Sequence, residues 1–277
     1  MKERFLVVVP LILEEREGEM GFTRRGLLTG AGRLAVGLAA GEAASQVAEA
    51  RQDSSQNVEA AKLKIVVAGG HPGDPEYGCG GTVAHFTALG HTATLLYLND
   101  GGWPPTPPEE RVAEAKKACE ILKAGRLYAG QQNGRSIVDN AHYEELAKLL
   151  LAEKPDAVFT QWPIDNHRDH RAITALVYDA WRHAKRKYAL YYYEVSNGED
   201  TLQFSPTHYV DITEIEPRKR AACYAHASQD PDRYYDLQDS VAKFRGIESG
   251  YLRAEAFVLQ VQSPFDVLAV FERPSAK

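Results

Sequence analysis

Residues 63–74 read LKIVVAGGHPGD, and this stretch decides the fold prediction. Its first six residues form a short apolar run rich in β-branched side chains, which is typical of a strand buried on both faces. Two glycines, which let backbone approach a ligand closely, and a His-Pro turn follow directly. The stretch therefore predicts a buried strand that leads straight into a polar loop.

The rest of the chain alternates predicted strands and helices. Such alternation predicts an α/β fold with a mainly parallel sheet between layers of helices. Ligands bind such sheets beyond the carboxyl ends of the strands, which directs attention to the loops after Ala68, Leu98 and Thr160. We expect strands over 63–68, 93–98, 126–129, 157–160, 188–195 and 254–260, and helices over 80–90, 107–125, 143–151, 172–183, 214–227 and 232–247.

Composition bounds the class of protein without specifying its chemistry. The chain has 277 residues, 44% of them hydrophobic and 25% charged, with a net charge of −6. These values exclude a collagen-like or wholly disordered chain, and the absence of a basic stripe argues against a nucleic-acid partner. No apolar run reaches the roughly 18 residues that a membrane span needs. The three cysteines lack close spacing, so we expect them to be free buried thiols.

The N-terminal segment differs from the rest. Arg24-Arg25 precede a Gly/Ala/Leu stretch that runs to Gly41, and small residues stand at Ala48 and Ala50. This pattern predicts a bacterial twin-arginine export signal, with Met20 as the true start and a periplasmic destination. The alternative is a surface helix with two exposed arginines, in a cytoplasmic protein. The predicted organisation is an extension with the signal over 1–50, a linker over 51–61 and a single domain over 62–277.

Two of the loops carry metal-ligating side chains at short spacing. His71 and Asp74 stand three residues apart after the first strand, and His167 and His170 stand three apart after the 157–160 strand. Two histidines from separate loops with one carboxylate suit a zinc ion that keeps an open position for water. Either pair alone would more often be a cap or an ion pair. Their joint placement after two parallel strands favours a metal site.

The ordered set of motifs resembles the LmbE-like (PIG-L) family of zinc-dependent N-acetylglucosamine deacetylases. The resemblance runs from about residue 63 to 260 and rests on the order of several motifs. These are His71-Pro72-x-Asp74, Gly80-Gly81-Thr82, Arg111 with Glu114, His167-x-Asp169-His170, Asp211-Ile212-Thr213-Glu214, His226-x-Ser228-Gln229, Gly250-Tyr251 and Ala254-Glu255-Ala256-Phe257.

The resemblance implies a Rossmann-like three-layer fold and a hydrolase in which zinc-bound water removes an acetyl group from an amino-sugar amide. It implies one zinc ion per chain, or another divalent metal, held by His71, Asp74 and His170. His167 would stabilise the oxyanion or protonate the leaving amine, and Asp169 would orient a histidine. The implied partner is a small amino sugar or glycoconjugate, and no oligomeric state follows.

One position departs from the family pattern His-Pro-Asp-Asp, whose first aspartate is the usual general base. Here that position is Gly73. Asp100 and Asp165 are the candidates to replace it, and Glu76 is a weaker one; each could instead make a turn or a supporting hydrogen bond. Losing a general base typically removes about 10²–10⁴ in rate, so the alternative is a protein that binds metal and glycan without efficient turnover.

Two further side chains are candidates for substrate binding. Trp103 follows the second strand and could stack on a sugar ring. Arg111 could reach a substrate hydroxyl or phosphate, or simply pair with Glu114. Other enzyme classes are disfavoured because the chain has no Gly-x-Gly-x-x-Gly after the first strand, no phosphate-binding P-loop and no Gly-x-Ser-x-Gly elbow.

Overall fold

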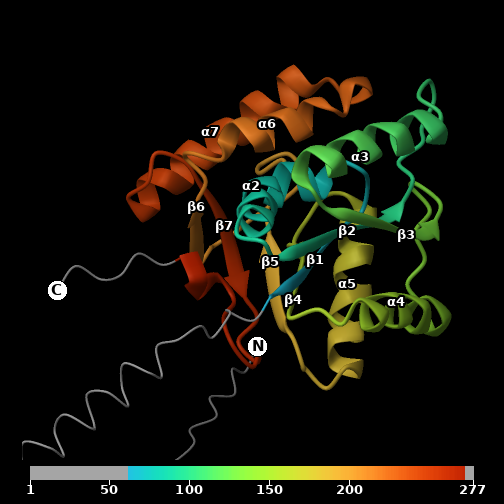
Figure 1. The fold of residues 1–277 in the computed structure, drawn as a ribbon. Coiled ribbons are helices and arrows are strands. Elements are labelled where there is room, and N and C mark those ends of the chain that lie inside the picture. The colour runs from blue at the N-terminus through green and yellow to red at the C-terminus, as the bar shows by residue number, and fades with distance from the viewer. Residues whose placement is uncertain (1–61, 272–277) are drawn as a thin grey trace, which may run out of the picture. The chain divides into compact units, whose positions relative to one another are not determined.

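The computed structural model describes residues 62–271. The predicted export signal and linker lie outside the described residues. The described part contains a seven-stranded, mostly parallel sheet and six α-helices, so the expected α/β class is confirmed (Figure 1).

The strands lie in the order β3-β2-β1-β4-β5-β7-β6. β1 pairs in parallel with both β2 and β4, so the chain leaves the sheet centre first to one side and then to the other. β7 runs antiparallel to β5 and to β6. The bounds are β1 Lys64–Gly69, β2 Thr92–Asn99, β3 Gly125–Gln131, β4 Ala157–Gln161, β5 Ala189–Tyr193, β6 His208–Asp211 and β7 Ala254–Leu259.

Helices cover both faces of the sheet. In Figure 1, α2, α3, α6 and α7 lie on one face, and α4 and α5 on the other. The helices span α2 Asp74–Ala88, α3 Pro108–Leu122, α4 Asn140–Glu153, α5 Arg168–His183, α6 Glu216–Tyr224 and α7 Pro231–Ser249, with short 3-10 turns η1 Ala227–Gln229 and η2 Leu268–Phe271.

Alternate residues of the strands feed two hydrophobic cores. Ile65 and Val67 pack in the core beneath α2, and Val66 and Ala68 pack in the core beneath α4 and α5. All four side chains are fully buried. Burial on both faces explains why β1 is apolar throughout.

The start of α2 corrects one sequence prediction. We expected a polar loop after the first strand and a helix from residue 80, but the helix begins at Asp74. Pro75 near its start and acidic residues in its first turn are favourable at a helix N-terminus. Gly78 lies inside this helix. A glycine is needed there because a Cβ would lie 2.3 Å from the Tyr193 ring. Close packing, not a loop, explains this glycine.

Two further boundaries differ from the predictions. α5 begins at Arg168 and not at 172, so His167 caps the helix and His170 lies in its first turn. The strand β6 was not predicted at all, and it is short, with four residues. Its neighbour β7 was predicted, but nothing in the pattern indicated that it runs antiparallel.

The sheet order brings the three selected loops to one edge. β2, β1 and β4 are adjacent and parallel, so their carboxyl ends meet. The chain reverses its direction of travel across the sheet between β1 and β4, where ligands of such folds bind. The fold therefore places the predicted metal-ligating residues together.

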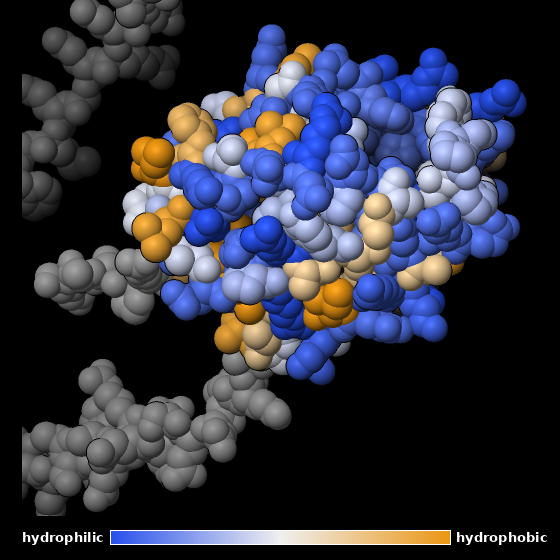
Figure 2. Space-filling view, turned by 90° about the horizontal axis from the view of Figure 1, so that it is seen from above, coloured by the Kyte–Doolittle hydropathy of each residue, from blue (hydrophilic) through white to orange (hydrophobic). Residues whose placement is uncertain are grey.

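Other expectations concern the surface and the thiols. Cys79, Cys119 and Cys223 are buried and free. Within residues 62–271, no helix combines the length and apolarity that crossing a membrane requires. Figure 2 shows a mainly polar face whose apolar residues gather toward the side where α7 ends; Phe244, Ile247 and Leu252 are exposed in that part of the chain.

Candidate metal centre

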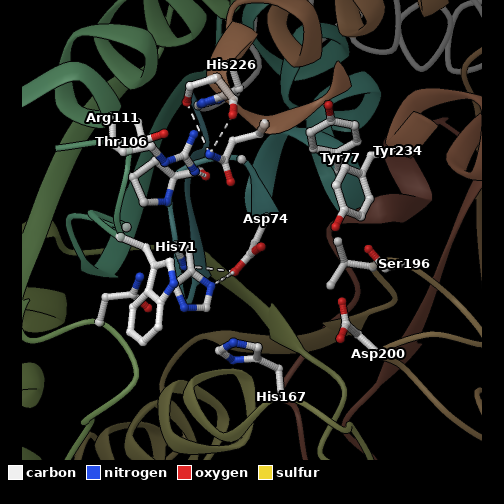
Figure 3. Close-up of a pocket in the computed structure, with 18 of the residues that line it drawn as sticks. His71, Asp74, Tyr77, Thr106, Arg111, His167, Ser196, Asp200, His226 and Tyr234 are labelled. Carbon is white, nitrogen blue, oxygen red and sulfur yellow. Dashed lines mark hydrogen bonds and ion pairs between the residues drawn. The ribbon is translucent and has the colours of Figure 1, made fainter. Parts of the chain in front are cut away.

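A cavity of about 440 Å³ opens at the carboxyl edge of the sheet. Its wall includes His71, Asp74 and His167, which Figure 3 shows, and also His170. His71 comes from the turn after β1, Asp74 is the first residue of α2, and the other two come from the start of α5. Two segments far apart in the sequence, 71–74 and 167–170, thus contribute to one cavity.

Asp74 lies between two histidines. Its Oδ2 is 3.1 Å from Nδ1 of His71 and 3.2 Å from Nε2 of His170. Ligands around a tetrahedral zinc ion, at 2.0–2.1 Å from it, lie about 3.3–3.4 Å from one another. The three atoms are therefore spaced like neighbouring corners of a metal's coordination shell.

His167 belongs to the same cluster. Nitrogen atoms of His71, His167 and His170 lie within 4.8 Å of one another. The Nδ1 of His167 accepts the backbone N–H of Asp169 at 3.2 Å, so its Nε2 carries the proton in the neutral ring. This makes His167 a hydrogen-bond donor, whereas a metal ligand needs a bare nitrogen.

Two carboxylates support the rings of the other histidines. Nε2 of His71 lies 3.1 Å from Oδ2 of Asp169, and Nδ1 of His170 lies 3.1 Å from Oδ1 of Asp165. Metal-ligating histidines usually hold their second nitrogen in this way, which fixes the ring and its tautomer. His71 Nδ1 and His170 Nε2 are left to face Asp74.

Asp165 therefore lies behind His170 and does not line the cavity. Its Oδ1 also accepts the His167 N–H at 2.7 Å, and its Oδ2 accepts the Thr201 hydroxyl at 3.1 Å. A carboxylate with these partners holds the loop together. This placement corrects its candidacy as a general base.

Asp100 and Glu76 also make internal contacts. Asp100 accepts the N–H of Gly102 at 2.9 Å, a turn contact, and does not line the cavity. Glu76 is fully buried and accepts from the Gly73 N–H, the Tyr97 hydroxyl and, at 3.1 Å, Nε2 of His226. Neither carboxylate is placed to receive a proton in the cavity.

The pKa shifts of Asp74 and the two histidines beside it show that these groups interact strongly. The two histidines outweigh burial and hold the pKa of Asp74 well below its usual range. Burial opposes a charge on His170, but Asp74 and Asp165 outweigh it and raise its pKa to about 10. Burial, together with the charges of the other two histidines, lowers the pKa of His167, which is therefore neutral near pH 7.

The backbone leaves space where a cation would sit. A Cβ on Gly70 would lie 3.0 Å from the His170 ring and 3.3 Å from Oδ2 of Asp74. A side chain at this position would crowd two of the three donors. The glycine, the converging donors and their supporting carboxylates together fit a zinc ion or a similar divalent cation.

Gly73 stands beside the cluster as the N-cap of α2, with φ of 112°. A Cβ there would have ordinary contacts, 3.8 Å to the Tyr77 ring and 4.0 Å to Cδ2 of His226. Position 73 therefore has room for a side chain, but its positive φ favours glycine. The cavity thus lacks the carboxylate that the family pattern has here.

A carboxylate that the sequence analysis missed lines the same cavity. Asp200 lies in the segment between β5 and β6. Because β5 is parallel to β4, its carboxyl end meets the same edge as the selected loops. The edge rule would have selected the loop after β5, although it does not single out Asp200 within that loop.

The two substrate candidates differ in exposure. Trp103 is 66% exposed and lines the cavity mouth. Arg111 is buried, where its Nη1 donates to Glu114 at 2.9 Å and its Nη2 donates to the carbonyl of Pro72. Its Nε has no hydrogen-bond partner within the described part of the chain. Arg111 therefore holds the loop that follows His71, and its one unpartnered donor is buried.

Comparison with known proteins gives consistent matches. The family model for GlcNAc-PI de-N-acetylase (PIG-L) matches residues 65–181. A diacetylchitobiose deacetylase of Thermococcus kodakarensis is 25% identical over 216 residues, which cover 69% of this chain and 81% of that protein.

Two solved structures resemble the fold over most of this chain. The conserved protein TT1542 from Thermus thermophilus is 27% identical with a TM-score of 0.66, covering 78% of this chain and 99% of that one. The N,N'-diacetylchitobiose deacetylase from Pyrococcus horikoshii is 19% identical with a TM-score of 0.62, covering 84% and 99%.

Proposed function

We propose, on the premise that the chain carries a PIG-L (LmbE-like) domain and is homologous to diacetylchitobiose deacetylase, that it removes an acetyl group from an N-acetylated amino sugar or its conjugate. The observation that carries this proposal is the convergence of His71, Asp74 and His170 in one cavity. This donor set suits zinc with an open coordination position.

A divalent cation held by these three side chains would lower the pKa of a water molecule and polarise the substrate's amide carbonyl. The chain's own residues would do the rest. Asp169 and Asp165 keep the two histidines in the tautomers that leave His71 Nδ1 and His170 Nε2 bare. One metal per chain is implied, because residues 62–271 contain one such cluster.

His167 suits stabilisation of the negative charge that develops on the amide oxygen. Its Nδ1 is occupied by a backbone N–H, so its Nε2–H is the group available to the cavity. A positioned donor of this kind typically contributes about 10²–10³ in rate. Because its pKa is lowered, the ring is not already charged before the reaction begins.

Trp103 and Arg111 are proposed to contact the sugar. An exposed indole at the cavity mouth offers an apolar face to a pyranose ring. Arg111 also lines the cavity, and its guanidinium would donate to a hydroxyl or phosphate oxygen of the substrate.

A second candidate function rests on Gly73. Without a carboxylate at this position the protein would bind metal and an amino-sugar ligand with little turnover. Stoichiometric zinc without acetate release from any substrate would favour this candidate.

The experiment for the leading proposal is an acetate-release assay on purified protein with zinc. N-Acetylglucosamine, N,N'-diacetylchitobiose and a larger N-acetylglucosamine conjugate are compared, with chelated protein as the control. The proposal expects acetate and a free amine in equal amounts from at least one substrate, and no release after chelation.

We also propose that residues 1–50 direct export through a twin-arginine signal, with residues 51–61 as a linker and 62–277 as one domain. The paired arginines Arg24-Arg25 support this proposal. Sequencing the N-terminus of the protein recovered from the periplasm tests it: a start near residue 51 is expected, and an uncleaved cytoplasmic protein would contradict it.

A further inference from the structure

The cavity needs a proton acceptor that residue 73 does not supply. Within residues 62–271, the carboxylates that line the cavity are those of Asp74 and Asp200. Asp74 faces the two histidines and is committed to the metal cluster. Asp200 is the remaining acidic side chain of the wall.

Asp200 is held in position by the loop that carries it. Its backbone N–H donates to the Ser196 carbonyl, and its own carbonyl accepts the N–H of Asn166, both at 2.9 Å. The next residue, Thr201, is fully buried and donates its hydroxyl to Asp165. The segment is thus fastened to the loop that supports His170.

The side chain of Asp200 lines the cavity that contains the candidate metal ligands. Figure 3 shows Asp200 beside Ser196 on the wall opposite His71, with Asp74 and His167 between them. A carboxylate on that wall meets the same open space as the cluster. A rigidly held acid at the edge of a reaction site is the arrangement that general-base catalysis needs.

The electrostatic surroundings of Asp200 also suit this role. Burial raises the pKa of Asp200; the nearby charge of His170 opposes the rise, and the carboxylates of Asp165 and Asp74 add to it. A carboxylate with a raised pKa holds a transferred proton more readily than an ordinary surface aspartate.

We infer that Asp200 is the proton acceptor that takes the place of the carboxylate missing at Gly73. The inference rests on the proposed deacetylation. Asp200 takes a proton from the attacking water as the water oxygen bonds to the amide carbon. It returns that proton to the departing amine nitrogen as the C–N bond breaks, so the products are acetate and a free amine.

His226 is the other candidate near residue 73, and its geometry excludes it. Its Nε2 is engaged with Glu76, and the ring atom nearest a Cβ at position 73 is the carbon Cδ2. Its Nδ1 is buried and has no hydrogen-bond partner within the described residues, so it is not exposed to the cavity. His226 therefore packs against the site without offering a nitrogen to it.

The first test is Asp200→Asn, which keeps the shape of the side chain and removes its basicity. We expect kcat to fall by about 10²–10⁴ while KM, zinc content and the dissociation constant for the glucosamine product change less than about threefold. Glu199→Gln is the matched control, because Glu199 lies on the same loop but pairs with Arg233 at the surface. This control should keep wild-type kcat.

A second test returns the carboxylate to the family's position. Gly73→Asp in the Asp200→Asn background should recover at least tenfold of the lost kcat, and Gly73→Asn, with similar backbone strain at φ of 112°, should recover none. The Asn variant separates charge from strain.

The outcomes distinguish the two proposals. If the wild type releases no acetate from any substrate, the deacetylase function fails. If the wild type is active and Asp200→Asn keeps its kcat, only the role of Asp200 is overturned. Loss of zinc, or a rise in KM or in the product's dissociation constant with kcat unchanged, would also overturn it, since Asp200 would then hold metal or substrate.

Discussion

At the residue scale, the carboxylates behind the histidines govern how tightly the cluster can hold a cation. Asp165 and Asp169 each receive a hydrogen bond from the ring nitrogen that faces away from Asp74. These bonds orient the imidazoles and make the opposite nitrogens better ligands. The supporting residues are thus as much a part of the candidate metal centre as the three candidate donors.

Asp165→Asn should weaken zinc binding about 10–100-fold, because the amide would support His170 less well than the carboxylate. Competition with a fluorescent zinc chelator measures the change. Asp100→Asn is the control, since Asp100 caps a turn away from the cluster and its variant should bind zinc like the wild type. Equal affinities for Asp165→Asn and wild type would contradict the role assigned to Asp165.

Zinc binding to the metal-free protein should release protons. The pKa of His170 is about 10 and that of His71 is also raised, so at pH 7 the metal-free cluster carries at least one proton that a metal must displace. Affinity should therefore increase with pH, about tenfold per unit for each proton released, until the pH passes the raised pKa. Calorimetry in buffers of different ionisation enthalpy counts these protons, and a count of zero would disprove this charge state.

The sequence predicted the candidate donors better than it predicted the base. Histidines and an aspartate at spacing three, after strands that end at one edge, identify themselves by residue type and position. Asp200 has no such motif, since it stands alone in a polar loop and reaches the cavity because Thr201 and Asn166 fix that loop. The hydrogen bond between Thr201 and Asp165 joins residues 36 positions apart, so no short sequence motif reveals it.

At the scale of single elements, α2 shows how packing overrides propensity. Its interior holds Gly78, Gly80 and Gly81, which weaken an isolated helix by about 1 kcal/mol each relative to alanine. Gly78 and Gly81 let the helix approach Tyr193 and Ile212 closely. The sequence pattern therefore placed the start of the helix at residue 80 instead of Asp74, and the packing partners Tyr193 and Ile212 lie more than 100 residues away in the sequence.

Two glycines of this helix give a matched pair of variants. Gly78→Ala should destabilise the protein by about 2–3 kcal/mol or more, because its Cβ would lie 2.3 Å from the Tyr193 ring and 2.8 Å from a backbone oxygen. Gly80→Ala should be neutral or stabilise by up to about 1 kcal/mol, since its Cβ would lie 3.3 Å from the aliphatic Lys219 Cγ.

Denaturant unfolding monitored by circular dichroism measures both free energies. The wild type is the reference, and the difference between the two variants removes the common effect of adding a methyl group to α2. Equal stabilities for the two alanine variants would show that close contact with Tyr193 is not the reason for Gly78.

At the scale of the whole molecule, the sheet order explains why distant segments form one site. The strand alternation predicted a mainly parallel sheet, because buried apolar runs and intervening helices follow from local pattern, and the structure adds the order β3-β2-β1-β4-β5 of its parallel part. The pairing of β7 with β5 and β6 was not predictable in the same way. β7 runs antiparallel to both neighbours, and this direction is set by its pairing with distant strands and not by its own residue pattern.

The same order concentrates chemistry at one edge. Residues after β1, β4 and β5 supply the donors, their supporting carboxylates and Asp200, while Trp103 and Arg111 follow β2. The two faces of the sheet are filled by apolar cores, so the carboxyl edge is where polar side chains can gather around a substrate.

The most direct test of the account measures acetate release from an N-acetylglucosamine conjugate while zinc is titrated into metal-free protein. The wild type and His170→Ala are followed side by side, with bound metal counted in each. Wild-type activity should rise with zinc to a plateau at one metal per chain, and His170→Ala should neither retain the metal nor release acetate. Undiminished acetate release by metal-free wild type or by His170→Ala would contradict it.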